Sequence, residues 1–253
     1  MIRAALLALG VLLAPDAKAS DCETVAFDGA SFTACTVDML EDDVRLFLRD
    51  PQGEVYGTFS RLEAGLPDGQ TLALAMNAGM FHEDLGPVGL YIEDGAQEMR
   101  LVTRDGPGNF GLLPNGVLCI SDARADVIES LKFAELNPAC RFATQSGPML
   151  VIDGQLHPRF RQNSVSLNVR NGVGVSNDGR TMVLAIADEP VNFHHFARFF
   201  RDELGTPNAL YLDGRVSRLH APGIDRSDFG FPVGPIIGIV VSDPSVDDAS
   251  GEG

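Results

Sequence analysis

The chain has 253 residues, and its 35 acidic side chains outnumber its 19 basic ones, so its formal net charge at pH 7 is −16. A field of this sign repels nucleic-acid phosphates and anionic membrane surfaces, and we expect no nucleic-acid partner. Apart from Lys18 and Lys132, every basic residue is an arginine. An anionic ligand would therefore have to be bound by a local group of arginine side chains.

The first nineteen residues have the pattern of a secretory signal peptide. Arg3 precedes an apolar run over residues 4–13, and Ala17-Lys18-Ala19 supplies the small residues that signal peptidase requires. A membrane-spanning helix needs about 20 apolar residues, roughly twice the length of this run. We therefore expect cleavage near Ala19, a periplasmic or secreted product without stable membrane insertion, a domain over residues 20–242 and a flexible acidic tail over 243–253.

The four cysteines all lie after the expected cleavage site, at Cys22, Cys35, Cys119 and Cys140. An even number of cysteines in an exported chain is typical of a disulfide framework. We favour Cys22 with Cys35 and Cys119 with Cys140, because each pair encloses a short stretch with a plausible turn, although the other pairings stay open. A zinc site is disfavoured, since no two of these cysteines have the close spacing that zinc sites use.

The first half of the mature chain carries two β-hairpin signals and one weak helix signal. The pairs Asp28-Gly29 and Asp94-Gly95 each separate short alternating apolar runs, and an Asp-Gly pair suits the tight primed turn of a hairpin. The strand-length run over residues 89–92 leads into the second turn. Between the two hairpins, residues 59–64 predict a short helix.

The middle of the chain repeats this pattern. Asn115-Gly116 and Asp153-Gly154 are further hairpin signals, flanked by the apolar runs 110–113 and 149–152. Residues 125–134 predict a second short helix.

The last third contains the clearest helix. Asp178-Gly179 precedes a strand over residues 182–186, and a further strand is predicted over 209–212. Between them, residues 193–204 carry apolar side chains at three-to-four spacing, with Asn192 as the N-cap and Gly205 as the stop. Together these elements predict a single α+β domain of mixed, largely antiparallel β-sheets with a few packed helices.

Four short motifs occur in the order seen in the phosphodiester glycosidase family, and the chain resembles that family over about residues 70–240. The motifs are residues 75–81, where a strand ends in Asn77-Ala78-Gly79-Met80-Phe81, and residues 145–151, where the Gly147-Pro148 turn leads into a strand. They continue with residues 169–175, where Arg170 precedes a Gly-Val-Gly strand with Asp178-Gly179 behind it, and residues 209–214, which end in Leu212-Asp213-Gly214. The family includes a lysosomal enzyme that removes N-acetylglucosamine from a phosphodiester-linked mannose tag. The likeness is greatest to exported bacterial members, and it implies an exported hydrolase that cleaves a sugar-phosphodiester or related glycosidic linkage.

The resemblance implies a set of site residues. Arg170 is the candidate for the phosphate, because its planar fork can bind two oxygens. Asp213 is the candidate carboxylate for the developing positive carbon or for activating water, and Asn77 would orient a hydroxyl or a phosphate oxygen. The further substrate contacts predicted are Gly79, Phe81, His82, Gln145, Ser146, Gly147, Asp188, Gly214 and Ser217. Each also has a structural interpretation: Asp213-Gly214 as an ordinary turn, for example, or Arg170 as the partner of an acid.

One departure from the family pattern weakens this interpretation. Arg215 stands where the family has a second glycine, although Ser217 can still supply the hydroxyl that follows it. An arginine is strained if that position requires a positive φ. This substitution favours the alternative of a catalytically silent glycan-binding envelope module with the same fold.

Two further hypotheses concern carboxylates. An ordinary glycosidase would need two acids about 5–10 Å apart, for which Asp213 and Asp188 are the pair to compare. No cofactor is identified, but oxygen ligands such as Asp84 and Asp213 make a divalent cation a possibility.

Overall fold

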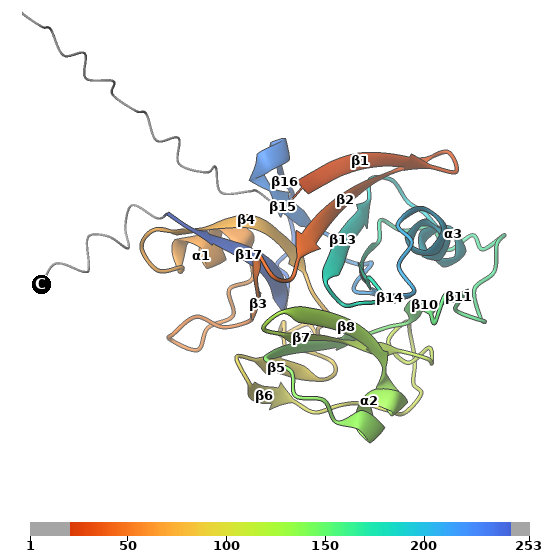
Figure 1. The fold of residues 1–253 in the computed structure, drawn as a ribbon, viewed down its shortest axis with the longest axis horizontal. Coiled ribbons are helices and arrows are strands. Elements are labelled where there is room, and N and C mark those ends of the chain that lie inside the picture. Colours follow the sequence, from red (N-terminus) through yellow and green to blue (C-terminus); the bar gives the residue numbers. More distant parts are fainter. Residues whose placement is uncertain (1–20, 244–253) are drawn as a thin grey trace, which may run out of the picture.

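The computed structural model describes residues 21–243. The predicted signal peptide and residues 244–253 of the predicted tail lie outside the described residues. Within them the chain forms three antiparallel β-sheets with a few short helices, which confirms the predicted α+β class (Figure 1).

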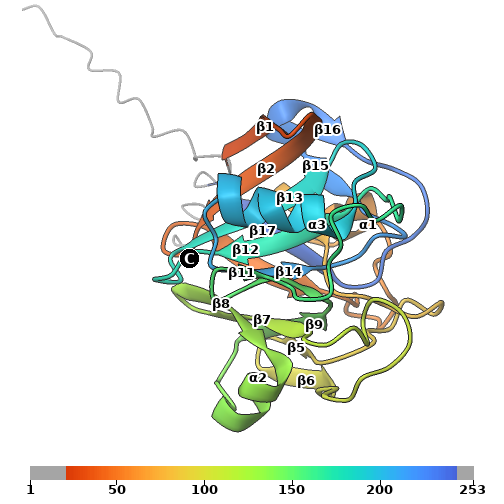
Figure 2. The ribbon, with the colours of Figure 1, turned by 90° about the vertical axis from the view of Figure 1, so that its right-hand side faces the viewer.

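The largest sheet has seven strands in the order β1-β2-β13-β12-β14-β10-β11. They are β1 (Asp21–Phe27), β2 (Ala30–Asp38), β10 (Met149–Ile152), β11 (Gln155–Leu156), β12 (Asn171–Val175), β13 (Thr181–Ala187) and β14 (Asn208–Tyr211). Helix α3 (Phe193–Arg198) and its π-helical continuation η1 (Phe199–Glu203) cover one face of this sheet (Figure 2). Their Phe199 stacks on Phe32 of β2, with ring centroids 4.0 Å apart, and the aromatic contact holds the helix on the sheet.

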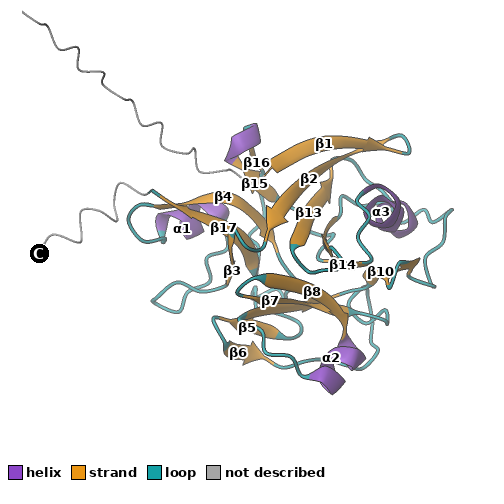
Figure 3. Cartoon of the chain, viewed as in Figure 1, coloured by secondary structure: helices purple, strands orange, loops and turns teal. Residues whose placement is uncertain are grey.

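Two five-stranded sheets complete the fold (Figure 3). The second sheet has the order β16-β15-β4-β17-β3, and its strands are β3 (Asp43–Phe47), β4 (Gln70–Asn77), β15 (Leu219–Ala221), β16 (Arg226–Ser227) and β17 (Ile236–Ser242). The third has the order β6-β5-β9-β7-β8, and its strands are β5 (Tyr91–Glu93), β6 (Ala96–Met99), β7 (Gly116–Ser121), β8 (Arg124–Glu129) and β9 (Phe142–Ser146). The remaining helices are α1 (Phe59–Ala64), α2 (Ser130–Leu136) and the 3₁₀ turn η2 (Pro222–Ile224).

The main hydrophobic core is shared by all three sheets. Leu184 of β13, Leu74 of β4 and Leu118 of β7 are each fully buried in the same cluster. Each such side chain contributes roughly 1.5–3 kcal/mol by leaving water. Because every sheet buries a face in this common core, the strand ends near it are held in fixed relative positions.

Most of the local predictions are confirmed. The pairs Asp28-Gly29, Asp94-Gly95 and Asp153-Gly154 form tight turns in which both residues have positive φ, as the primed hairpin turn requires. Asp178-Gly179 also joins two paired strands, in a longer loop where Gly179 alone has positive φ. Helix α1 has the predicted bounds, and Asn192 caps α3 by accepting the N–H of His195.

Three local predictions are wrong. Asn115-Gly116 is not a turn: Asn115 is buried, and Gly116 opens β7, where a side chain would crowd Met149. The run 110–113 is a series of bends and turns and forms no strand. The helix expected over 125–134 begins at Ser130, because Arg124–Glu129 pairs with β7 as a strand. Pairing between distant segments overrides the weak local preference there.

Both favoured disulfides are formed. Cys22 and Cys35 face one another across β1 and β2, and Cys119 of β7 is bonded to Cys140 just before β9. Two disulfides fit an extracellular or periplasmic protein. Among residues 21–243 no helix has the length and apolar character that crossing a membrane requires.

Candidate active site

The four motif segments converge where strands of all three sheets end or begin. Asn77 is the last residue of β4 in the second sheet, and Asn171 is the first residue of β12 in the large sheet. Strand β14 pairs with β12 through Gly172 and Tyr211, and Asp213 follows two residues beyond this pair. The order and spacing of the motifs therefore correspond to one location in the fold.

Asn171 is the centre of the hydrogen bonds at this junction. Its Nδ2 donates to the carbonyl oxygen of Asn77 at 2.9 Å and to Asn77 Oδ1 at 3.1 Å. Its Oδ1 accepts the N–H of Asp213 at 2.9 Å and the hydroxyl of Ser217 at 3.3 Å. Asn171 thus connects the second sheet with the loop that follows β14, and both of its amide atoms are fully buried in doing so.

The Asp213 carboxyl is almost completely buried, with 8% of the residue exposed. Its Oδ1 accepts the N–H groups of Gly214 and Arg215, the latter at 2.9 Å. Burial raises the pKa of the Asp213 carboxyl, and the N–H groups of Arg215 and Gly214 together with the charge of Arg215 oppose part of the rise. A desolvated carboxyl with a raised pKa is typical of a group that exchanges protons during catalysis.

Arg170 is fully buried and has no acidic partner among the residues that the structure describes. Its Nε donates to the carbonyl of Val191 at 2.9 Å, one terminal nitrogen to the carbonyl of Ser166 at 3.0 Å, and the other to the Tyr211 hydroxyl at 3.3 Å. The guanidinium also lies 3.7 Å above the ring centre of Phe193. Burial lowers the pKa of Arg170, and Tyr211 offsets part of this effect.

Tyr211 joins Arg170 to the Asp213 loop. Burial raises the pKa of its phenol, the positive charge of Arg170 opposes the rise, and the negative charge of Asp213 adds to it. A Cβ at Gly214 would overlap the Tyr211 hydroxyl. Glycine is therefore required at 214 by this close approach, since its φ is not positive.

The strain expected at Arg215 is absent. Arg215 is not among the described residues with positive φ, and its side chain is exposed. The arginine is therefore accommodated without backbone strain. Ser217, which follows it, donates its hydroxyl to the carbonyl of Asp213 at 2.7 Å and so closes the loop.

The end of β9 and the turn that leads into β10 contact the Asp213 loop. The Ser146 hydroxyl donates to the carbonyl of Leu212 at 2.7 Å and accepts the N–H of Met80 at 3.4 Å. Gly147 is buried, and a Cβ there would lie 2.6 Å from Cβ of Asn115. These contacts hold the segments around Met80 and Leu212 together.

Gln145 has no free hydrogen-bonding capacity. Its Oε1 accepts the N–H groups of Leu90 and Val102, and its Nε2 donates to the carbonyl of Val102 and to the Ser130 hydroxyl. All four bonds of the amide are thus used inside the protein. In this arrangement the side chain fixes the loop around residues 90–102 and offers nothing to a ligand.

The remaining candidates at the first motif become more exposed to solvent along the chain. Gly79 is buried, and its N–H donates to the Thr144 hydroxyl at 3.2 Å. Phe81 is partly buried against the cluster that includes Val233, whereas His82 is exposed. His82 therefore borders the segment from the solvent side.

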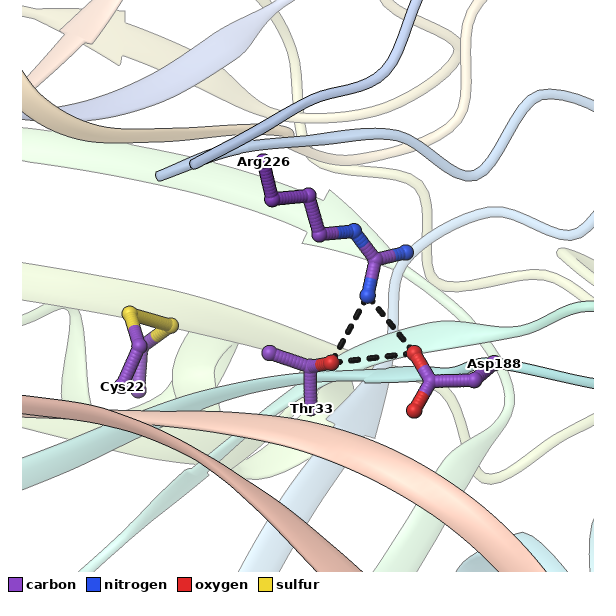
Figure 4. The surroundings of a disulfide bond; sticks show 5 residues. Cys22, Thr33, Asp188 and Arg226 are labelled. Carbon is purple, nitrogen blue, oxygen red and sulfur yellow. Dashed lines mark hydrogen bonds and ion pairs between the residues drawn. A yellow bond between two sulfur atoms is a disulfide. The ribbon is translucent and has the colours of Figure 1, made fainter. Parts of the chain in front are cut away.

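Asp188 lies in a different set of contacts, shown in Figure 4. One of its oxygens accepts the Thr33 hydroxyl at 2.9 Å and pairs with Arg226 at 2.6 Å, as the figure shows. The other accepts the Ser31 hydroxyl at 2.8 Å. These partners belong to β2 and β16, and the structure does not join Asp188 to Asp213. Asp188 is held as part of a surface ion pair.

The acidic residues considered for a divalent cation are also separate. Asp84 is exposed, and its Oδ1 accepts the N–H of Gly86 at 3.0 Å. Within residues 21–243 no group of three or more His, Cys, Asp or Glu side chains is placed to hold a metal ion.

Comparison with known proteins identifies the family. The model of the phosphodiester glycosidase family matches residues 70–239, which include every motif segment described above. The chain belongs to the phosphodiester glycosidase family.

Relatives of this phosphodiester glycosidase family member share most of its length. Protein YigE of Escherichia coli strain K12, described as uncharacterized, is 33% identical over 217 residues, covering 86% of this chain and 84% of YigE. The catalytic domain of zebrafish N-acetylglucosamine-1-phosphodiester alpha-N-acetylglucosaminidase, auto-inhibited by its pro-peptide, superposes with a TM-score of 0.60 at 15% identity, covering 89% of this chain and 85% of that domain. A hypothetical protein from Synechocystis has a TM-score of 0.59 at 14% identity, covering 87% and 61%. The two structures show a shared fold.

Two residues of the candidate site were not selected from the sequence. Asn171 sits inside the third motif and Tyr211 inside the fourth, each as a polar group at a buried strand end. A polar side chain in an otherwise apolar strand is the signal that marks them, because a buried polar group needs a partner.

Proposed function

We propose that the chain is an exported hydrolase that cleaves a sugar-phosphodiester or related glycosidic linkage. The observation that carries this proposal is that Tyr211 binds the buried Arg170, which lacks an acidic partner among the described residues, and lies against Gly214 in the loop of the buried Asp213 carboxyl. The family and the shared fold with the zebrafish domain support the same reaction class.

The proposed reaction needs few catalytic groups. The bond between the anomeric carbon and the phosphate oxygen breaks, and its electron pair stays with the departing phosphate. Water adds to the anomeric carbon and gives its proton to the Asp213 carboxylate. Arg170 supplies positive charge for the anionic leaving group, whose low basicity makes a strong general acid unnecessary. In this scheme Asn77 anchors Asn171, which binds the N–H of Asp213 and so sets the position from which Asp213 acts.

A glycan-binding module without turnover is the second candidate. It rests on Arg215, which replaces the family's second glycine with a charged side chain next to Asp213. In that case sugar phosphates would bind and remain intact.

Hydrolysis of a substrate panel separates the two functions. We expect the mature chain to hydrolyse one or more methyl phosphodiesters of sugar 1-phosphates and to leave the matching methyl glycosides intact. Arg170→Met should lower kcat/KM about 10²–10³-fold, the usual effect of removing one preorganised charge stabiliser. Arg180→Met, which removes an exposed arginine paired with Asp38, is the control and should keep full activity. Binding without turnover of any panel member would favour the silent module. The same assay repeated with a chelator tests whether hydrolysis requires a divalent cation.

Export is proposed from the N-terminal pattern together with the two disulfides. We expect the chain recovered from the periplasm or medium to begin at Ser20 and to contain no free thiols. Intact mass measured with and without reduction tests both statements, because reduction of two disulfides adds four hydrogen atoms. A product that retains residues 1–19 would contradict cleavage near Ala19.

A further inference from the structure

Arg218 is a second arginine beside the candidate site. It directly precedes β15, whose Leu219 pairs with Met76 of β4. Its backbone N–H donates to Asn77 Oδ1 at 2.8 Å. Asn77 is the residue that Asn171 binds, so the backbone of Arg218 is linked to Asn171 through Asn77.

Arg218 is largely buried as a residue, but its guanidinium nitrogens stay accessible to solvent and have no partner within residues 21–243. The residue is 8% exposed, and its side chain makes no hydrogen bond or ion pair with any described residue. Burial lowers its pKa, and the charge of Asp228 opposes part of the effect. Asp228 itself is occupied, because its two oxygens accept Nε and a terminal nitrogen of Arg226 and the N–H of Leu219.

The loop over residues 228–235 leaves room for this side chain. Gly230 has a φ of +140°, and a Cβ there would lie 2.6 Å from a terminal nitrogen of Arg218. The carbonyl of Pro235 accepts the N–H of Ala78 at 2.7 Å, which ties the loop to the end of β4. The loop therefore packs on the guanidinium with a glycine and supplies no acceptor to it.

Arg170 and Arg218 differ in the number of side-chain N–H groups that remain free to bind a ligand. Arg170 uses three of its nitrogens on Val191, Ser166 and Tyr211. Arg218 keeps all five of its side-chain N–H groups for an external acceptor. A partly desolvated cation without a counter-ion is costly, and an anion bound at the accessible nitrogens of Arg218 would offset part of that cost.

We propose that Arg218 is the primary contact for the phosphoryl oxygens of the substrate, while Arg170 adds its positive charge and positions Tyr211. The planar fork of arginine fits two phosphoryl oxygens at once. This inference rests on the proposed phosphodiester substrate, but phosphoryl binding is measurable without turnover.

Calorimetric titration with N-acetylglucosamine 1-phosphate, glucose 1-phosphate and dimethyl phosphate tests the role of Arg218, with glucuronate as a carboxylate probe. We expect Arg218→Met to raise the Kd of phosphoryl ligands at least about 10-fold, the usual effect of losing a charged hydrogen bond. Arg218→Lys should raise it less, and Arg170→Met should raise it less than Arg218→Met. Arg180→Met should leave it unchanged, and the thermal unfolding of each variant verifies folding.

Several outcomes would overturn the assignment: phosphoryl binding by Arg218→Met equal to that of the parent, no phosphoryl binding by the parent, preference for glucuronate, or an equal loss in Arg180→Met. The hydrolase proposal fails separately. Phosphoryl binding that depends on Arg218 without turnover of any diester would retain the Arg218 contact and reject the hydrolase. Parental kcat/KM in Arg218→Met would reject the contact and retain the hydrolase.

Discussion

Asp213→Asn is expected to remove turnover and, at neutral pH, to make the folded chain more stable. Loss of a group that takes up a proton in the transition state typically lowers the rate about 10²–10⁴-fold. Asparagine keeps the shape of the side chain, and its Oδ1 can still accept the N–H groups of Gly214 and Arg215. The substitution therefore removes a charge without removing the loop's hydrogen bonds.

The gain in stability follows from the direction of the pKa shift. Burial raises the pKa of Asp213 in the folded state, so the folded chain holds this proton more tightly than the unfolded chain does. The ionised carboxylate consequently costs stability above the folded pKa, and the cost disappears as the pH falls through that pKa toward the unfolded value. The difference in free energy of unfolding between Asp213→Asn and the parent should be largest near pH 7 and shrink in acid.

Asp178→Asn provides a control of opposite sign. The Ser176 hydroxyl and the N–H of Arg180 lower the pKa of Asp178, so its ionised form contributes stability above the unfolded pKa, and this contribution is lost as pH falls through the folded pKa. Its replacement should lower stability at neutral pH and leave kcat unchanged. Denaturant unfolding from pH 3 to 8 with parallel rate measurements tests both variants. An Asp213→Asn chain with parental turnover would exclude Asp213 as the catalytic carboxylate.

Asn171→Ala is expected to be the most destabilising substitution at the site. It leaves the N–H of Asp213 and both oxygens of Asn77 without their Asn171 partner in a region closed to water. Each buried group that loses its partner costs about 1–3 kcal/mol, so we expect a loss of about 3 kcal/mol or more. The Asp213 loop would also lose the connection to β4 that Asn171 makes, and turnover should fall with it.

Asn168→Ala is the matched control for this substitution. Asn168 is exposed three residues earlier, and its backbone pairs with Val191. Surface changes of this kind usually alter stability by less than about 0.5 kcal/mol. Urea unfolding of the two variants makes the comparison, and equal midpoints would show that Asn171 is not the centre of the junction.

The sequence predictions were accurate where neighbouring residues determine the structure and inaccurate where distant residues determine it. The turn at Asp28-Gly29 and the start of α3 at Asn192 were predictable because backbone conformation and capping involve neighbouring residues. Residues 125–129 could not be assigned in this way, since their strand exists only through pairing with β7. The Asn115-Gly116 turn was predicted wrongly for a related reason. Glycine at 116 gives room to Met149, a residue that is distant in the sequence.

The same distinction applies to the candidate site. The segments could be located from their motifs, but the bond between Asn171 and Asn77 joins residues 94 positions apart. Likewise, the four bonds that occupy the Gln145 amide come from three separate segments of the chain. Whether a polar residue serves the scaffold or a ligand depends on such distant partners, and composition and spacing do not contain that information.

The hydrogen bonds of Asn171 join the large sheet to the second sheet, and these two sheets share a common hydrophobic core. A small sliding of the second sheet against the large one would leave most strand pairs and both disulfides intact, yet it would separate Asn77 from the loop of Asp213. Activity should therefore respond to mild heating or low denaturant before spectroscopic measures of secondary structure do. Loss of activity would therefore report a shift between the two sheets before the strands themselves unfold.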